Sequence, residues 1–243
     1  MDWKTPVLRM FLKMGYGIYK IGRGDEYNLC PPHEYRTYAP WYEGWFQEIY
    51  DRIRANVICR EDHCYVIQNF TKHCSLFEGD FAECGVYKGG TAFLIADTLV
   101  NNSVQERKLH LFDTFAGMPA TAKEDPSGMK EGQLGDTSLS AVEEYLKKFP
   151  FIVFHPGLIP ETFEVVKDRK FAFVHIDVDL YQTSKDCCNF FYDRLIPGGV
   201  MIFDDYGMLY FKDSEKRAVD EFFSDKPESP IALHTGQCII IKL

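Results

Sequence analysis

The stretch DFAECGVYKGGTAFLIADTLV, residues 80–100, joins a short apolar run to a helical window through a glycine-rich turn. Asp80–Val86 has the length of a buried strand, and Gly90–Val100 has the length and apolar spacing of a helix. A strand that leads into a helix in this way is the building unit of α/β folds with a parallel sheet. The stretch therefore predicts an α/β fold.

The same alternation of short apolar runs and helical windows continues toward the C-terminus. Further strands are expected at Leu109–Thr114, Ile152–His155, Phe171–Asp177 and Val200–Asp204. Further helices are expected at Ser138–Phe149, Tyr181–Leu195 and Glu215–Phe223. Ile231–Leu233 and Cys238–Lys242 follow each other without a helix, which predicts an antiparallel hairpin at one edge. We expect a mostly parallel sheet covered on both faces.

The first 75 residues are richer in Tyr, Trp, His and Arg. Val7–Ile21 is apolar but interrupted by charges, which predicts an amphipathic helix instead of a membrane span, and helical spacing runs from about Trp41 to Ile58. We therefore divide the chain into an N-terminal helical extension or lid, residues 1–75, and a sheet domain, residues 76–243. The aromatic side chains of the lid suit stacking on a sugar or aromatic ring, or packing in a dimer interface. They are Tyr35, Tyr38, Trp41, Tyr42 and Trp45.

The composition excludes several classes of protein. The 243 residues are 46% hydrophobic, enough for one folded core, and 27 Lys and Arg against 36 Asp and Glu give a net charge of −9. That charge disfavours nucleic acid and anionic membranes as partners. Eight cysteines are too few for a disulfide scaffold in a chain of this length, and we find no signal peptide, so we expect a reducing cytoplasmic setting.

Three of the expected strands end in acidic residues. Asp113 lies at the end of the second strand, Asp177 and Asp179 at the end of the fourth, and Asp204 and Asp205 at the end of the fifth. Parallel strands bring these ends to one rim, where carboxylates would repel one another. Their coexistence implies a bound cation, raised pKa values, or wrong strand assignments. Mg²⁺ or Mn²⁺ prefers such oxygen ligands.

The glycine turn and the long connection after Asp113 are candidates for cofactor contact. Backbone amides at a helix N-terminus suit a carboxylate or phosphate, although a tight turn without a ligand is the alternative. The turn lacks the Gly-x-Gly-x-x-Gly pattern, and Asp113 lies 28 residues beyond Gly85, both of which weaken a nicotinamide dinucleotide interpretation. An acid at the end of the second strand suits a bidentate hydrogen bond to ribose hydroxyls, which favours an adenosine-containing ligand without a pyrophosphate. The Gly- and Pro-rich stretch Phe115–Thr137 is long enough to be a lid or binding loop.

Two other kinds of site find little support. Cysteines and histidines gather between Cys59 and Cys74, but without a Cys-x-x-Cys pair, so a zinc site there is not expected. His110, His155 and His175 lie in or beside strands and are expected to be hydrogen-bonded core residues. No Gly-x-Ser-x-Gly turn supports a serine hydrolase.

Five motifs in this order resemble the macrocin O-methyltransferase (TylF/MycF-type) family over about residues 56–240. They are Glu83-Cys84-Gly85-Val86-Tyr87-Lys88-Gly89-Gly90, Asp113-Thr114-Phe115-Ala116-Gly117-Met118-Pro119, Gly135-Asp136-Thr137-Ser138, His175-Ile176-Asp177-Val178-Asp179-Leu180-Tyr181, and Pro197-Gly198-Gly199-Val200 with Asp204-Asp205-Tyr206. The resemblance implies a class I methyltransferase with a Rossmann-like sheet. It also implies S-adenosylmethionine and Mg²⁺ (or Mn²⁺) as cofactors.

The resemblance assigns roles to individual residues. Asp177, Asp204 and Asp205 would bind the metal, and Asp179 would be the general base. Asp113 would hold the ribose. The other residues expected at the cofactor are Glu83, Gly85, Val86, Tyr87, Gly89, Thr114, Phe115, Gly117, Asp136 and Ser138. The implied enzyme is an O-methyltransferase that acts on a hydroxyl of a small molecule, a sugar in natural-product biosynthesis, and assembles as a homo-oligomer, a dimer.

Three alternatives stay open. A catechol-type acceptor would chelate the metal through both of its oxygens. A nicotinamide-dependent oxidoreductase would show NADH binding and no metal dependence. A non-catalytic nucleotide-binding protein would bind cofactor without turnover.

Overall fold

The computed structural model describes residues 46–104 and 106–243 in full. It also describes Val7, Met10, Phe11, Lys13, Met14 and Trp41, and the backbone of Trp45 and of the segments 17–20 and 27–30. The chain divides into two compact units, residues 1–43 and 44–243. No helix among these residues is long and apolar enough to cross a membrane.

The first unit contains a two-stranded sheet. β1 (Gly17–Lys20) pairs with β2 (Tyr27–Cys30) in antiparallel register. Helical backbone is described at Val7, Met10, Phe11 and Lys13. The predicted helix Val7–Ile21 is therefore wrong over Gly17–Lys20, where Ile and Tyr favour strands and a partner strand is available.

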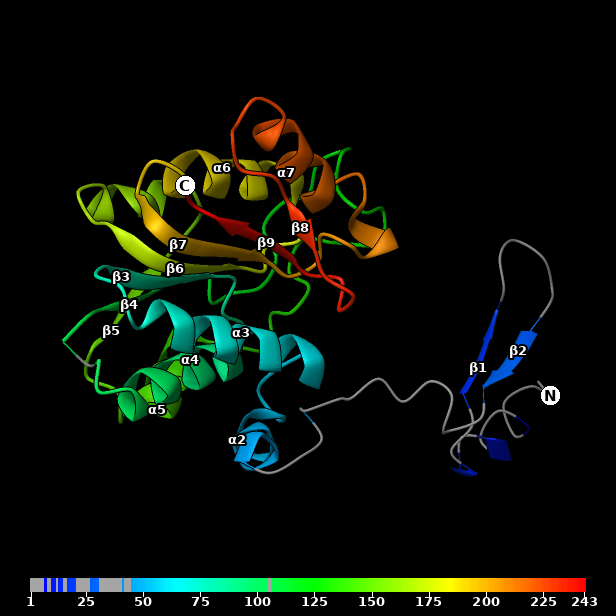
Figure 1. Ribbon diagram of the computed structural model, residues 1–243. Coiled ribbons are helices and arrows are strands. Elements are labelled where there is room, and N and C mark those ends of the chain that lie inside the picture. The colour runs from blue at the N-terminus through cyan, green and yellow to red at the C-terminus, as the bar shows by residue number, and fades with distance from the viewer. Residues whose placement is uncertain are drawn as a thin grey trace. The chain divides into compact units, whose positions relative to one another are not determined.

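Seven strands of the second unit form one sheet in the order β5-β4-β3-β6-β7-β9-β8 (Figure 1). Strands β3 to β7 are parallel, and β9 is antiparallel to both β7 and β8. This confirms the expected parallel sheet with an antiparallel C-terminal hairpin. The strands are β3 (Asp80–Cys84), β4 (Leu109–Asp113), β5 (Ile152–Pro156), β6 (Phe171–Ile176), β7 (Leu195–Phe203), β8 (Ile231–Ala232) and β9 (Cys238–Ile241).

Helices cover both faces of this sheet. Figure 1 shows α3, α4 and α5 on one face, with α2 beside them, and α6 and α7 on the other. Two 3₁₀ helices complete the unit. The helices are α2 (Trp45–Ile53), α3 (Glu61–Cys74), α4 (Gly90–Asn101), α5 (Leu139–Leu146), η2 (Glu161–Val166), α6 (Tyr181–Phe191), η3 (Leu209–Phe211) and α7 (Glu215–Phe223).

The N-terminal boundary of the sheet unit lies before α2. Phe46, Ile49 and Ile53 of α2 are buried, and α3 packs against α4, β6 and β7. Helical spacing between Trp41 and Ile58 predicted part of this region, whereas α3 was not predicted as a separate helix. That residues 1–75 act as a lid stays a prediction.

The strand order reverses beside β3. The chain runs outward through β4 and β5, then returns to place β6 on the other side of β3. In open α/β sheets, ligands bind beyond the carboxyl ends of the strands at this point. The residues that follow β3 and β6 here are Gly85 and Asp177. The topology alone therefore brings the glycine turn next to the acidic rim.

Aromatic side chains fill the core between the sheet and α6. Phe112, Phe163, Phe171 and Phe191 are buried and meet edge to face, with ring centroids 5.0 to 5.1 Å apart along the chain of contacts. Such packing favours one arrangement of rings over others. It fixes β4, β6 and α6, which carry candidate site residues at their ends.

Candidate active site

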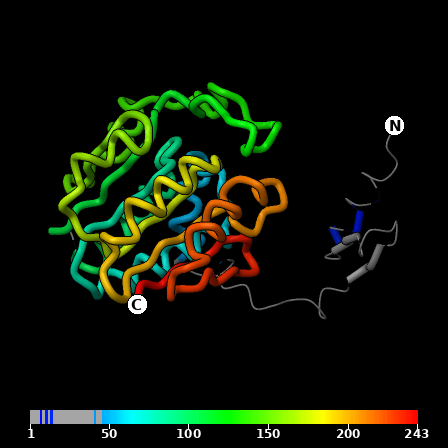
Figure 2. The backbone as a smooth tube through the Cα atoms, turned by 90° about the horizontal axis from the view of Figure 1, so that it is seen from above, coloured from blue at the N-terminus to red at the C-terminus, as the bar shows by residue number. Residues whose placement is uncertain are grey.

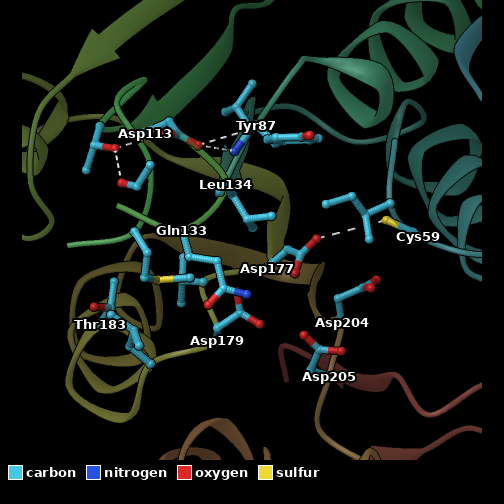
Figure 3. Close-up of a pocket in the computed structure, with 18 of the residues that line it drawn as sticks. Cys59, Tyr87, Asp113, Gln133, Leu134, Asp177, Asp179, Thr183, Asp204 and Asp205 are labelled. Carbon is cyan, nitrogen blue, oxygen red and sulfur yellow. Dashed lines mark hydrogen bonds between the residues drawn. The ribbon is translucent and has the colours of Figure 1, made fainter. Parts of the chain in front are cut away.

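A cavity of about 490 Å³ lies beyond the carboxyl ends of β3, β4, β6 and β7 (Figure 3). The turn after β3 and the loop after β4 form one side, with Asp113. Asp177, Asp179, Asp204 and Asp205 line the other side. The volume is in the range of small-molecule and cofactor sites.

Gly85 holds the two sides of the cavity together. Its backbone has φ +86, and a Cβ atom placed on it would lie 1.8 Å from the carbonyl oxygen of Asp177. No residue with a side chain fits there, so the end of β3 lies directly on the backbone of Asp177. Glycine at this position is required by packing whether or not a cofactor is bound.

Asp113 links the turn after β3 to the loop after β4. Its Oδ2 accepts hydrogen bonds from the backbone amides of Val86 (2.6 Å) and Tyr87 (3.0 Å), and its Oδ1 accepts one from Phe115 (2.7 Å). Tyr87 and Phe115 both have left-handed backbones, with φ of 51° and 52°. Such strained residues concentrate at functional sites. A ribose bound by Asp113 would share this carboxylate with the backbone.

The structure brings six of the residues expected at the cofactor to the cavity wall. They are Gly85, Val86, Tyr87, Asp113, Thr114 and Gly117.

The other five lie behind that wall or outside it. Glu83 is buried and hydrogen-bonded to His175, Gly89 is the N-cap residue of α4, and Phe115 packs on Phe154. Asp136 is exposed and accepts a hydrogen bond from the hydroxyl of Tyr87 (2.8 Å). Ser138 caps α5 by accepting from the amide of Ala141 (3.3 Å). Their contact with a cofactor stays a prediction.

The long stretch 115–137 is a loop of turns without helix or strand, as predicted. It is fastened to α6, because Oδ1 of Asp125 accepts from the amide of Tyr181 (2.8 Å) and Oδ2 accepts from Ala122 (2.7 Å). It also lies against η3, where a Cβ on Gly128 would be 2.2 Å from the hydroxyl oxygen of Tyr210. Figures 1 and 2 show this green loop beside the orange segment that contains η3.

Replacing Asp125 with alanine is expected to loosen this loop. The change removes the acceptor of the first amide of α6, an interaction like that of an N-cap side chain, which is worth about 0.5 to 2 kcal/mol, and frees the loop from the helix. We expect faster cleavage within residues 115–137 in limited proteolysis read by mass spectrometry. Glu131→Ala, an exposed acid in the same loop, is the matched control. Equal cleavage of the two variants would contradict a fastening role for Asp125.

The four acids expected at the rim all line the cavity, but Asp204 shares a group of close ligand atoms with Asp177 and Cys59 and not with Asp179 and Asp205. Ligand oxygens of Asp177, Asp179 and Asp205 are all within 4.8 Å of one another. Burial, reinforced by the neighbouring carboxylates, raises the pKa of Asp177 well above its usual range, that of Asp205 to about 8 and that of Asp179 to about 6. Burial and the neighbouring carboxylates therefore both disfavour the charged forms of these three groups.

Asp204 differs from its neighbours because two histidines donate to it. Its Oδ2 accepts from Nδ1 of His63 (2.8 Å), and its Oδ1 accepts from Nε2 of His175 (3.3 Å) and from Gln237 (2.8 Å). Burial alone would raise the pKa of Asp204, but the hydrogen bonds and charge of His175 and His63 lower it below its usual value. Asp204 is thus held as a carboxylate in a fixed orientation.

Both histidines have acceptors at each ring nitrogen. His175 lies between Glu83 (2.9 Å) and Asp204, and His63 lies between Asp204 and the carbonyl oxygen of Thr235 (2.9 Å). Burial opposes charge on them, but these hydrogen bonds outweigh it and raise the pKa of each above its ordinary value. His110 is likewise bonded, to His155 and Asp80. The expectation of hydrogen-bonded core histidines is confirmed.

The donor set fits a divalent cation. Carboxylate oxygens are the ligands that Mg²⁺ and Mn²⁺ prefer, and those of Asp177, Asp179 and Asp205 lie within 4.8 Å of one another. Among the described residues, no group of the cysteines and histidines between Cys59 and Cys74 comes close enough to hold an ion by itself. Cys59 instead joins Asp177 and Asp204, with ligand atoms within 4.8 Å of one another.

Cys59 and His63 were not predicted as site residues. In the sequence they are candidates only for a zinc site within residues 59–74, where the Cys-x-x-Cys spacing of zinc ligands is absent. The residue that Cys59 meets, Asp177, is 118 positions away. No local pattern reports such a contact, so only the fold reveals it.

The sheet order, the glycine turn after β3 and the acids after β6 and β7 together define a Rossmann-like class I methyltransferase fold. The chain belongs to the macrocin-O-methyltransferase (TylF) family, whose sequence model matches residues 69–232.

Three curated relatives are natural-product methyltransferases. The chain is 29% identical over 154 residues to demethyldecarbamoylnovobiocin O-methyltransferase of Streptomyces niveus (59% of this chain, 58% of the relative). It is 29% identical over 140 residues to mycinamicin III 3''-O-methyltransferase of Micromonospora griseorubida (53% and 55%). It is 26% identical over 146 residues to 8-demethyl-8-(2,3-dimethoxy-alpha-L-rhamnosyl)-tetracenomycin-C 4'-O-methyltransferase of Streptomyces olivaceus (56% and 56%). The chain thus spans just over half the length of the curated relatives it matches.

Solved structures share the fold. The O-methyltransferase NovP superposes with a TM-score of 0.60 at 22% identity, covering 74% of this chain and 78% of that one. An O-methyltransferase from Bacillus cereus in complex with SAH superposes with a TM-score of 0.56 at 13% identity, covering 86% and 94%. These similarities support the assignment of fold.

Proposed function

We propose that this chain is an S-adenosylmethionine-dependent O-methyltransferase that acts on a hydroxyl of a small molecule, a sugar of a natural product. The observation that carries the proposal is the single cavity that joins Asp113 and the glycine turn to the four acids. One side suits an adenosine ligand, and the other suits activation of a hydroxyl. Family membership and the names of the relatives support the same reaction.

The reaction forms one bond and breaks another. The acceptor oxygen attacks the methyl carbon, the carbon–sulfur bond of the sulfonium breaks, and S-adenosylhomocysteine leaves. The hydroxyl proton passes to Asp179. An ordinary aspartate is a weak base, but burial raises the pKa of Asp179 to about 6, closer to the working pH.

A divalent cation would be held by Asp177, Asp204 and Asp205. When bound, it acts as a Lewis acid that stabilises developing negative charge on the acceptor oxygen. The hydrogen bonds from His63 and His175 orient the Asp204 carboxylate toward that task. Acidic side chains around the cavity also suit the positive charge of the methyl donor.

The experiment that tests this function is a mass-spectrometric screen for the 14-dalton gain of a methyl group on candidate acceptors. Glycosylated natural products, catechols and buffer alone form the arms, each with S-adenosylmethionine and with Mg²⁺ or chelator. Methylation of glycosides supports the proposal, and methylation of catechols alone would favour the catechol alternative. NADH fluorescence changes without any methylation would reject the whole class. An unchanged rate in chelator would remove the metal from the mechanism.

Binding of the cofactor gives a further expected result. S-adenosylmethionine or S-adenosylhomocysteine at about 100 times its Kd should stabilise the protein by roughly 2.7 kcal/mol in thermal unfolding, whereas NAD should not. Asp113→Ala should abolish most of that stabilisation, because the ribose hydroxyls lose their acceptor.

Asp225→Ala is the control, since Asp225 lies outside the cavity and pairs with its neighbour Lys226. It should keep the full stabilisation. Equal shifts with NAD, or an undiminished shift in Asp113→Ala, would contradict the cofactor site.

A further inference from the structure

Cys59 has a position among the acids that the proposed function does not use. Its sulfur lies 3.9 Å from Oδ2 of Asp177, and its ligand atom lies within 4.8 Å of those of Asp177 and Asp204. Figure 3 shows the thiol directed at Asp177, with a dashed line between the two side chains. Cys59 is half-buried and lines the same cavity.

Hydrogen bonds hold the residues on both sides of Cys59. The carbonyl oxygen of Asn56 accepts from the amide of Gly90 (3.1 Å), and a Cβ on Gly90 would lie 2.6 Å from that oxygen. On the other side, the Arg60 guanidinium donates to Asp62 and to the carbonyl oxygen of Thr235 (2.9 Å). The thiol is therefore presented to the acids by contacts that do not involve the acids themselves.

We propose that Cys59 is a ligand of the divalent cation at this site, together with Asp177 and Asp204. Its sulfur then shifts the preference of the site from Mg²⁺ toward a borderline metal such as Zn²⁺ or Co²⁺. This inference rests on the metal site of the proposed function. It keeps Asp177 and Asp204, puts Cys59 in the place of Asp205, and names the class of metal that the site takes.

The spacing allows one ion to meet sulfur and oxygen together. A zinc–sulfur bond is about 2.3 Å and a zinc–carboxylate bond about 2.0 to 2.2 Å, so two such ligands can be as much as about 4.5 Å apart. The 3.9 Å between Cys59 and Asp177 lies below that limit. The side chains need no large movement to bind.

The chemistry of the ligand atoms decides which metal the site prefers. Thiolate is a soft ligand that favours Zn²⁺ and its neighbours over Mg²⁺, which takes hard oxygen ligands. Three protein ligands with one position left open are typical of catalytic zinc sites. Outside this group, His63, His175 and Gln237 hold the Asp204 carboxylate in orientation, as outer contacts do around many metal ligands.

The simpler account of Cys59 is a thiol that donates a weak hydrogen bond to Asp177. A serine would do the same with similar size, so Cys59→Ser separates the two accounts. It keeps a donor and removes the soft ligand.

The test is titration of the purified full-length chain with Co²⁺, followed by absorption spectroscopy. Direct sulfur ligation produces an intense thiolate-to-cobalt charge-transfer band in the near ultraviolet, and carboxylate ligation does not. We expect the band in the wild type, its loss in Cys59→Ser, and its retention in Cys64→Ala, which removes the neighbouring thiol. By competition, Cys59→Ser should lower Zn²⁺ affinity at least about tenfold while Mg²⁺ affinity changes little.

Each contrary result identifies what is wrong. If Co²⁺ binds the wild type without the band, if Cys64→Ala removes the band while Cys59→Ser keeps it, or if no divalent ion binds at all, Cys59 is not a ligand. Absence of the band in the wild type decides against Cys59 even if a variant misfolds. Methyl transfer and stabilisation by S-adenosylmethionine are measured separately, so the methyltransferase proposal survives or fails independently of this outcome.

Discussion

Replacing Asp179 with asparagine is expected to lower turnover by about 10²- to 10⁴-fold, the usual contribution of a general base. The amide cannot take the acceptor proton at neutral pH. Asparagine has nearly the same shape and tolerates the left-handed backbone of this position, where φ is 62°, so the variant should fold. Turnover is measured with the acceptor found in the screen, and metal and cofactor binding by calorimetry.

Asp177→Asn is the matched comparison, because it removes the same charge two residues away. A neutral amide is a weaker ligand for a hard cation, so metal affinity should fall and excess metal should restore part of the activity. Added metal should not rescue Asp179→Asn. Since Asp179 also lies within 4.8 Å of its neighbours' oxygens, the reverse pattern would exchange the two roles. Asp204 is a poorer choice, because its carboxylate also holds His63 and His175.

Gly85→Ala is expected to produce the largest loss of stability of any single change at the site. The added Cβ would lie 1.8 Å from the carbonyl oxygen of Asp177, and the backbone at φ +86 disfavours any side chain. The left-handed conformation costs about 1 to 2 kcal/mol and overpacking about 1 to 3 kcal/mol more. Together they are a large fraction of the stability of a typical domain, about 5 to 15 kcal/mol.

Gly132→Ala separates the cost of a left-handed backbone from the cost of a steric clash with a neighbouring residue. Gly132 has a similar φ of +77, but an added Cβ would meet no atom within 4 Å. It should cost only the conformational part, about 1 to 2 kcal/mol. Chemical unfolding measures both variants, and cofactor binding should also fall in Gly85→Ala because its turn is displaced. Equal losses in the two variants would mean that contact with Asp177 does not constrain Gly85.

The sequence predicted most elements of the sheet domain because their signals are local. Apolar runs of strand length, glycine turns and helical windows identified every strand of the seven-stranded sheet, including the C-terminal hairpin. The ends of the helices and strands were less well predicted. Helix α6 ends at Phe191 instead of Leu195, and β7 begins at Leu195 instead of Val200. Pro197 and the two following glycines concealed the start of a strand that its partner stabilises by hydrogen bonding.

The acids of the site were also predictable, since each directly follows an apolar strand. Parallel strands end at the same rim, so Asp113, Asp177 and Asp204 had to lie near one another once the sheet was accepted. The sequence left three explanations open for this crowding: a bound cation, raised pKa values or wrong strand assignments. The strands are as predicted. Burial raises the pKa of Asp177, Asp179 and Asp205, and their oxygens also form a donor set that fits a cation.

Only the tertiary structure showed that His63 and His175 keep Asp204 charged, and that Cys59 faces Asp177. The sequence by itself determined the α/β class, the glycine turn and the acidic strand ends, because those follow from neighbouring residues. The tertiary structure decided that Asp136 and Ser138 lie outside the cavity wall and that Cys59 lies among the acids. These outcomes depend on how segments far apart in the chain pack together, and local patterns of residues do not encode such contacts.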